Sequence, residues 1–241
     1  MSYNILSKFY DRLMTDVNYD AWCDFIIEKT NLNKNSIIVD AACGTGAIAL
    51  RLAKHGARVI GVDNSDEMLA VASQNARNSG VNVSFSSMDI SNMNFHKPVD
   101  AICCVCDGVN YISEKSVHSF IKSAYNALTE KGTLIFDISS EYKLRTILGD
   151  NLFFEDYDDV TYMWQNTVKN KTVDMDLCFF VKQLNGSYIR YDEQHTQYIH
   201  KYDDIYKELS LCGFSKINAY DCYSTNSLSS NTERITFVAT K

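Results

Sequence analysis

A glycine turn with acidic residues near it is the part of the sequence best suited to bind a ligand. The run Asp40-Ala41-Ala42-Cys43-Gly44-Thr45-Gly46 contains two glycines, which let the backbone bend sharply and approach a ligand without a Cβ in the way. Asp63 follows, and a carboxylate there can accept hydrogen bonds from the two vicinal hydroxyls of a ribose. Asp89 is placed to meet the amino group of an adenine. Together these residues indicate a ligand that contains adenosine.

Alternating strands and helices position these residues. Ser65 is a predicted helix N-cap, Gly80 a predicted C-terminal cap, and Lys131-Gly132 is predicted to stop the helix before the fifth strand. The predicted strands are 36–40, 58–62, 81–85, 99–106 and 133–137, and the predicted helices are 19–30, 48–56, 65–80 and 116–128. This order predicts a doubly wound, mostly parallel α/β sheet, in which ligands bind beyond the carboxyl ends of the strands.

The pattern changes after the fifth strand, where Tyr, Phe, Val and Thr become frequent. Asn185-Gly186 is a strong hairpin signal, because both residue types tolerate positive φ. Three extended stretches, 160–168, 172–183 and 187–199, predict a small antiparallel insertion. A helix at 202–212 and strands at 216–223 and 234–240 then complete a seven-stranded sheet.

The predicted organisation is one α/β domain with an inserted β lid. Residues 1–150 form the ligand-binding part, with a helical cap at 1–35, and residues 151–200 form the lid. Residues 201–241 complete the α/β domain.

These residues alone leave an NAD-dependent oxidoreductase open. Gly44-x-Gly46-x-x-Ala49 satisfies the G-x-G-x-x-G/A pattern of dinucleotide-binding folds, and Asp63 stands at a suitable distance for the ribose of NAD. A single glycine pattern of this kind does not separate an NAD-dependent oxidoreductase from other proteins that bind an adenosine ligand.

Four segments resemble the motifs of class I S-adenosylmethionine-dependent methyltransferases. Residues 39–46 resemble the first motif, an acid, small residues and G-x-G, and residues 62–69 resemble the second, D-x-S-x-x-M-L. Ser87-Met88-Asp89 resembles the third motif, and Asp100-Ala101-Ile102 resembles the start of that family's fourth strand. The resemblance implies a Rossmann-like seven-stranded fold, S-adenosyl-L-methionine as cofactor and methyl transfer as the reaction.

The resemblance also implies which residues contact the cofactor. Ala42, with Gly44 and Gly46 in the same turn, would lie against the methionine part, and Asp63 would hold the ribose. Val105 or Cys106 would offer a backbone carbonyl to the methionine ammonium. The residues implied around the adenine are Asn64, Met68, Asp89 and Ile90.

The N-terminal segment narrows the resemblance. Phe9-Tyr10-Asp11-x-Leu13-Met14, followed by Tyr19-x-x-Trp22, is similar to a segment of small-molecule methyltransferases such as sugar N,N-dimethyltransferases. In that group the first tyrosine reaches the cofactor and helps to close the site. This resemblance assigns that role to Tyr10 first and to Tyr19 second.

Candidate catalytic residues follow the fourth strand, in Asp107-Gly108-Val109-Asn110-Tyr111. Relatives commonly show D-S-[LIV]-N-Y here, so Gly108 departs from the pattern; we select Asp107, Asn110 and Tyr111. The lid is expected to close over the site and exclude water. Its His195 is the candidate general base, and the expected pocket-lining residues of the lid are Tyr162, Trp164, Arg190 and His195.

Composition limits the partners. The net charge is −7 and no cluster of Lys or Arg stands out, which favours a small-molecule substrate over nucleic acid. The sequence contains no apolar run that would span a membrane, and residues 1–10 lack a secretory pattern, so we expect a cytoplasmic monomer or homodimer.

Cys103-Cys104-x-Cys106 lies in an apolar run and predicts buried thiols, with no metal site. An RNA or protein methyltransferase and a non-catalytic cofactor-binding module remain as alternatives.

Overall fold

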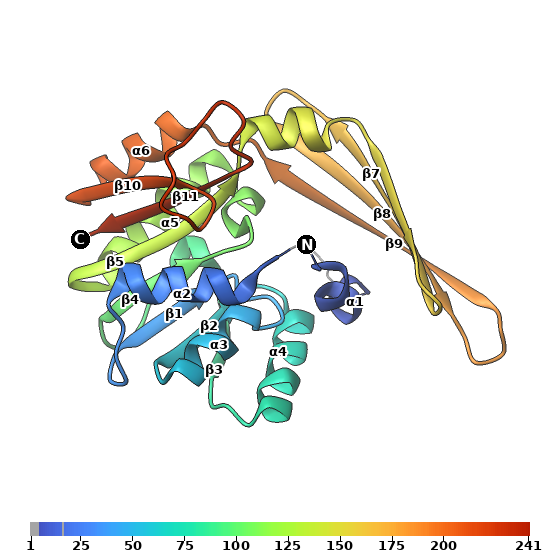
Figure 1. Cartoon of the computed structure of the whole chain (residues 1–241), viewed down its shortest axis with the longest axis horizontal. Helices are drawn as coiled ribbons and strands as arrows, with labels where there is room; N and C mark the ends of the chain where they lie inside the picture. The colour runs from blue at the N-terminus through green and yellow to red at the C-terminus, as the bar shows by residue number, and fades with distance from the viewer. Residues whose placement is uncertain (1–4, 16) are drawn as a thin grey trace.

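The computed structural model describes residues 5–15 and 17–241, which form a layered α/β body and a separate antiparallel sheet (Figure 1). The seven strands of the body lie in the order β10-β11-β5-β4-β1-β2-β3. Neighbours from β3 to β5 pair in parallel, and β11 runs antiparallel to both β5 and β10. The strands are β1 (Ile37–Ala41), β2 (Arg58–Asp63), β3 (Ser84–Ser87), β4 (Val99–Cys104), β5 (Leu128–Ser139), β10 (Lys216–Asp221) and β11 (Arg234–Thr240).

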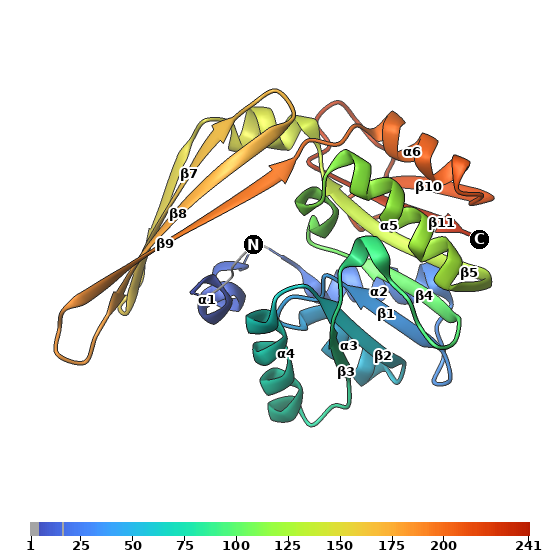
Figure 2. The same cartoon turned by 180° about the vertical axis from the view of Figure 1, so that it is seen from behind.

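Helices cover both faces of this sheet. Figure 2 shows α5 and α6 on one face, and α2 and α3 lie on the other. The helices are α1 (Leu6–Leu13), α2 (Tyr19–Thr30), α3 (Ala47–His55), α4 (Asp66–Ser79), α5 (Glu114–Ala127) and α6 (Tyr202–Leu211), with short turns η1 (Ile90–Asn92), η2 (Gly108–Tyr111) and η3 (Lys143–Leu148). The doubly wound, mostly parallel seven-stranded fold is therefore confirmed, and its order reverses between β1 and β4.

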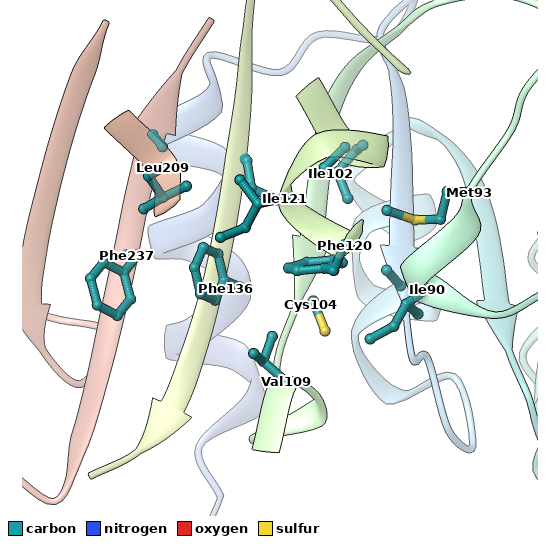
Figure 3. Packing of buried hydrophobic residues seen from close by; sticks show 14 of the residues in the cluster. Ile90, Met93, Ile102, Cys104, Val109, Phe120, Ile121, Phe136, Leu209 and Phe237 are labelled. Atoms are coloured by element: carbon teal, nitrogen blue, oxygen red, sulfur yellow. The ribbon is translucent and has the colours of Figure 1, made fainter. Parts of the chain in front are cut away.

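Two apolar cores hold the layers together. Phe120 of α5 packs edge to face on Phe136 of β5, which stacks on Phe237 of β11 (Figure 3). Cys104 belongs to this core, whereas Cys103 belongs to the core under α2 and α3. Successive residues of a strand point to opposite faces, so the cysteines of this run fill two different interiors as apolar side chains do.

Local signals explain both ends of α4. The Ser65 side chain accepts a hydrogen bond from the Met68 amide at 3.2 Å, and Gly80 closes α4 in the left-handed conformation, as predicted. The stop predicted at Lys131-Gly132 is wrong, because α5 already ends at Ala127. Leu128 is buried and pairs with Val99, so β5 begins at this residue, before Lys131 and Gly132.

The second sheet, here called the lid, has the order β6-β7-β8-β9 and is antiparallel throughout. Its strands are β6 (Leu152–Asp156), β7 (Val160–Val168), β8 (Thr172–Lys182) and β9 (Tyr188–Tyr198). The prediction of three strands is therefore wrong by one. The fourth, β6, is a short edge strand whose side chains are mostly exposed, so it lacks the alternation of apolar and polar residues that marks a half-buried strand.

Helix α1 lies between the body and the lid in both views (Figures 1 and 2). Ile5 joins Val160, Tyr162 and Phe179 of the lid in one apolar cluster, and Phe9 stacks on Phe179 with 6.3 Å between ring centroids. Helix α2 packs on the body instead. Within the described ranges, no helix combines the length and apolarity needed to cross a bilayer. The division into segments 1–150, 151–200 and 201–241 stays a prediction.

Candidate cofactor and substrate site

The turn after β1 uses its two glycines differently. Gly44 has φ +53°, and a Cβ built on it would meet nothing within 4 Å, so this side of the turn is open to a ligand. Gly46 has φ +84°, and its Cβ would meet the Ala72 Cβ at 3.2 Å and the Phe85 ring at 3.3 Å. Gly46 therefore starts α3 and allows close packing, while Gly44 permits backbone approach. Ala42 also has positive φ, at +55°.

Two acidic residues fix this turn. Asp63 at the end of β2 accepts the Gly44 amide at 2.8 Å and the Ser65 amide at 2.9 Å. Burial raises the pKa of Asp63, while these amide hydrogen bonds oppose the rise. Asp40 is 1% exposed and accepts the Ala49 amide of α3 at 2.9 Å. Burial raises the pKa of Asp40 to about 7, and the hydrogen bond from the Ala49 amide, which ties this carboxyl to the first turn of α3, opposes the rise.

The residues assigned to the adenine gather beyond β2 and β3. Asn64 and Asp89 are exposed, whereas Met68 and Ile90 are buried. The Asp89 Oδ1 accepts the Ser91 amide at 2.8 Å and so caps η1. The placement of these residues around an adenine stays a prediction.

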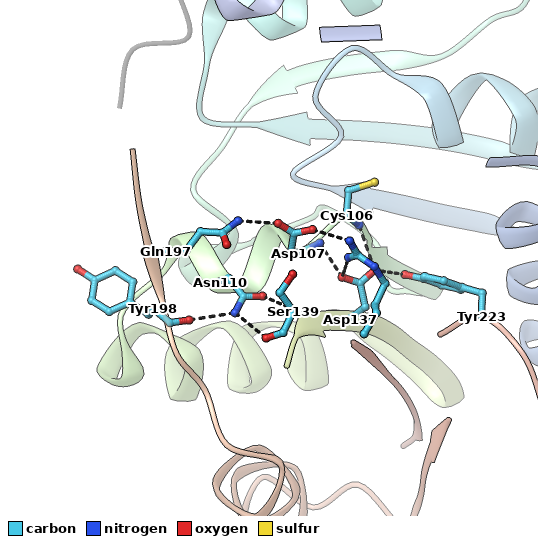
Figure 4. A network of polar contacts seen from close by, with 9 residues as sticks. Cys106, Asp107, Asn110, Asp137, Ser139, Gln197, Tyr198 and Tyr223 are labelled. Carbon is cyan, nitrogen blue, oxygen red and sulfur yellow. Dashed lines mark hydrogen bonds and ion pairs between the residues drawn. The ribbon is translucent and has the colours of Figure 1, made fainter. Parts of the chain in front are cut away.

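The loop after β4 is held by a buried polar network (Figure 4). The Asp137 carboxylate accepts the Cys106 amide at 3.0 Å and the Asp107 amide at 2.6 Å. It also accepts the Tyr223 hydroxyl at 2.5 Å and Arg234 Nη1 at 2.7 Å. Burial opposes the charge on Arg234, but the carboxylates of Asp137 and Asp107 outweigh it and raise the pKa of this guanidinium.

The lid reaches the same loop through Asp107. Gln197 of β9 donates to Asp107 Oδ2 at 2.6 Å, and Arg234 Nη2 lies 2.9 Å from Asp107 Oδ1. Asn110 is fully buried; its amide donates to the Tyr198 carbonyl at 2.9 Å and accepts the Ser139 amide at 2.8 Å. Both side chains thus join the β4 loop to other elements, a geometry that favours positioning over direct catalysis.

The N-terminal tyrosines meet the β4 loop. Tyr19 lies near Cys106: burial raises the pKa of the Tyr19 hydroxyl, and Cys106 raises it further. Burial raises the pKa of Tyr10, and the nearby Cys106 and Asp107 raise it further. Asp11 fixes α1 on the glycine turn, because it accepts hydrogen bonds from the Thr45 hydroxyl and, at 3.2 Å, from Asn75.

The lid residues divide between two faces. Buried His195 lies edge-on to Tyr111, with 6.3 Å between ring centroids, and its Nε2 is 3.4 Å from Glu193 Oε2. Arg190 is exposed and pairs with Asp192 at 2.8 Å. It lies on the opposite face of β9 from His195, so the prediction that Arg190 lines the pocket is wrong.

Two predicted lid aromatics lie on the face toward α1. Tyr162 stacks on Phe179, with 5.9 Å between ring centroids, inside the cluster that also contains Ile5. Trp164 donates from Nε1 to Asn166 at 2.5 Å. Tyr162 is therefore part of the contact between the lid and α1.

Known proteins with a similar sequence or structure are methyltransferases. A methyltransferase domain matches residues 38–132. A protein of Geobacillus sp. (strain WCH70) named as a methyltransferase is 33% identical over 247 residues, covering 100% of both chains. The crystal structure of an S-adenosylmethionine-dependent methyltransferase from Clostridium acetobutylicum ATCC 824 has a TM-score of 0.89 at 38% identity, covering 99% of this chain and 98% of that one. The chain belongs to the S-adenosylmethionine-dependent methyltransferases.

A more distant structure shares the fold of this methyltransferase. An amino pentose methyltransferase from Micromonospora echinaspora has a TM-score of 0.76 at 16% identity, covering 100% of this chain and 98% of that one. The family excludes the NAD-dependent oxidoreductase that the glycine pattern left open. The cofactor is S-adenosyl-L-methionine. The open side of Gly44 leaves room for the cofactor to approach the protein backbone, and the adjacent Asp63 carboxylate suits the hydroxyls of its ribose.

The structure also explains why this methyltransferase has glycine at position 108. A Cβ on Gly108 would lie 2.9 Å from the Cys104 Sγ and 3.0 Å from the Ala42 Cβ. The serine common in relatives would therefore collide with the end of β4 and with the glycine turn.

Sequence reasoning missed several residues that hold the site. Asp137 and Arg234 were not selected, although a carboxylate inside the apolar run 133–139 was a usable signal. The methyltransferase residues missed are Asp11, Thr45, Asp137, Glu193, Gln197, Tyr223 and Arg234.

Proposed function

We propose that this methyltransferase acts on an amine or hydroxyl of a small molecule held between the carboxyl edge of the body and the lid. The observation that carries the proposal is the link from β9 to the β4 loop, through Gln197 and Asp107 at 2.6 Å and through His195 against Tyr111. These contacts support an acceptor site beside the loop that the family uses for the methionine end of the cofactor. A site roofed by a sheet suits a small acceptor better than a folded RNA or protein.

Charge and aromatic rings favour an acceptor that carries an amine. The chain has a net charge of −7, and the tyrosines Tyr10, Tyr19 and Tyr111 gather around the β4 loop. Aromatic faces attract cations by about 0.5–2 kcal/mol, depending on desolvation. The amino pentose methyltransferase with the same fold also has an amine-bearing sugar as its named substrate. We therefore favour N-methylation over O-methylation and expect no nucleic-acid partner.

Positioning carries most of the proposed chemistry. When bound, S-adenosylmethionine supplies a methyl group activated by its sulfonium. Holding the acceptor in line with that methyl group contributes roughly 7–11 kcal/mol to lowering the barrier. The lid and Tyr111 would orient the acceptor, and α1 would help to exclude water.

His195 is the proposed general base. Glu193, 3.4 Å from its Nε2, would orient the imidazole and stabilise the charge it gains when it takes the acceptor's proton. General-base catalysis contributes about 10² to 10⁴ in rate. Asp107 and Asn110 would act by fixing the loop that carries Tyr111.

The decisive experiment incubates the protein with S-adenosylmethionine carrying a tritiated methyl group and a fractionated cell extract. Label is expected in the low-molecular-weight fraction, and Asp63→Ala should abolish it. Label confined to RNA or protein would contradict the small-molecule proposal. Absence of label from every fraction, with the cofactor bound, would favour a non-catalytic module.

A second measurement tests the base once the acceptor is known. His195→Gln should lower kcat about 100-fold while the affinity for S-adenosylhomocysteine stays unchanged. Undiminished turnover by this variant would remove His195 from the chemistry.

A further inference from the structure

The backbone after β4 adopts the left-handed conformation at two consecutive residues. Cys106 has φ +57° and Asp107 has φ +51°. Neither is glycine, and a Cβ disfavours this region, so such a pair persists only where surrounding contacts hold it. The same loop carries Val105 and Cys106, and the family resemblance implies that one of them would offer its backbone carbonyl to the methionine ammonium.

Asp137 supplies those contacts from the neighbouring strand. Its Oδ2 accepts the Cys106 amide at 3.0 Å, and its Oδ1 accepts the Asp107 amide at 2.6 Å (Figure 4). The Asp137 side chain is fully buried in β5, so the sheet itself sets the position of both oxygens. Two successive peptide units are thereby fixed to one carboxylate.

Arg234 at the start of β11 fixes that carboxylate in turn. Its Nη1 lies 2.7 Å from Asp137 Oδ1, and its Nη2 lies 2.9 Å from Asp107 Oδ1. The guanidinium lies over the Trp22 ring, 5.0 Å from its centroid. A planar guanidinium can join two carboxylates at once while stacked on a ring, whereas the point charge of a lysine cannot.

We infer that Asp137 and Arg234 are positioning residues for the methionine end of the cofactor, acting through the Cys106 and Asp107 backbone. Neither is a catalytic residue, since each acts through the loop. The inference rests on the proposed placement of the cofactor between the Gly44 turn and this loop.

Two ligands separate this role from a purely structural one. S-adenosylhomocysteine carries the amino acid end, whereas 5′-methylthioadenosine has the adenine, ribose and sulfur but lacks the amino and carboxyl groups. In Asp137→Asn and Arg234→Lys, we expect the loop to adopt its binding conformation only about a tenth of the time. S-adenosylhomocysteine should then bind about tenfold more weakly. The affinity for 5′-methylthioadenosine should change less than about twofold, because this ligand does not use the loop.

Isothermal titration calorimetry on the full chain measures both affinities. Equal weakening of both ligands, or unchanged affinity for S-adenosylhomocysteine in both variants, would overturn the inference. If Asp137→Asn fails to fold, Arg234→Lys carries the test alone. The matched control is Asp100→Asn, since Asp100 accepts the Ile37 amide at 2.8 Å at the opposite end of β4 and should affect neither ligand.

Two further variants locate the cause. Asp63→Ala should weaken both ligands, and if it weakens neither, the cofactor placement fails independently of Asp137. Adding Cys106→Gly to Asp137→Asn should recover part of the lost affinity for S-adenosylhomocysteine, because glycine reaches the left-handed region at little cost. If the affinity for S-adenosylhomocysteine did not recover, this would contradict the inference that Asp137 acts through the backbone of Cys106.

Discussion

The body and the lid are both built on β-sheets, yet they would contribute to the proposed site in different ways. The body shapes its edge with backbone, through the left-handed residues Ala42, Gly44, Cys106 and Asp107 at the ends of β1 and β4. The lid would contribute side chains, chiefly Glu193, His195 and Gln197, which share one face of β9 and contact Ile5, Tyr111 and Asp107. The body is also buried on both faces, whereas the outer lid face leaves Phe154 69% exposed. Changes in the body should therefore damage cofactor binding, and changes in the lid should damage closure.

The strongest test of this contrast compares two glycines with similar local geometry. Gly44 in the body and Gly186 in the lid both have positive φ and open space around a built Cβ. Alanine at either position adds backbone strain of about 1–2 kcal/mol. Only Gly44→Ala should also lower the affinity for S-adenosylhomocysteine, by about 100-fold through lost backbone approach. Calorimetry of the two variants checks this, and equal affinities would show that Gly44 does not face the cofactor.

The next largest effect concerns packing under the glycine turn. Gly108→Ser places a Cβ against Cys104 and Ala42, and overpacking of this kind typically destabilises by about 1–3 kcal/mol. Urea unfolding measures the loss. Cys104→Ala should partly relieve it in the double variant, because the nearest atom, the Cys104 Sγ, is removed. Strict additivity of the two changes would contradict this explanation of the glycine.

A smaller effect is expected where the lid holds α1. Glu193 accepts the Ile5 amide at 2.5 Å and the Leu6 amide at 3.1 Å. Hydrogen bonds to a buried charge contribute about 1.5–3 kcal/mol, so Glu193→Ala should speed hydrogen exchange of the α1 amides at least about tenfold. Exchange in the body should not change, and Glu130→Ala, at an exposed position of β5, serves as the control.

The same carboxylate predicts a pH dependence. Burial raises the pKa of Glu193, but His195 and the two amides outweigh it and hold this pKa below its usual value of 4.5. A carboxyl group with a lowered pKa stabilises the folded state above that usual value and loses its effect as the pH falls through its folded-state value. Protection of α1 should therefore persist from neutral pH to about 4.5 and decline below it. Decline in Glu193→Gln at the same pH would point to another group.

The fold of the body could be predicted from the sequence because the residues that determine its turns and helix ends are close together in the chain. The strand ends that carry Gly44 and Asp63, the Ser65 cap and the Gly80 stop each depend on neighbouring residues. The polar network was not readable in this way. Arg234 meets Asp137 only because β11 inserts beside β5, and Gln197 meets Asp107 only because the lid folds back over β4. Such pairs are fixed by topology, and no periodicity along the chain encodes them.

The smallest predicted effect lies at the exposed end of the contact between α1 and the lid. Arg12 donates to both oxygens of Asp159, at 2.9 and 3.2 Å, but both side chains are largely exposed. Exposed ion pairs contribute about 0.2–1 kcal/mol and weaken with salt. Arg12→Ala should therefore speed α1 exchange less than about fivefold, well below the effect of Glu193→Ala. Asp159→Ala should have a smaller effect, because Arg12 also lies over the Phe9 and Tyr157 rings, which that variant keeps. The double variant should add nothing to Arg12→Ala. An effect as large as that of Glu193→Ala would mean that surface charge, and not the buried carboxylate, holds α1 on the lid.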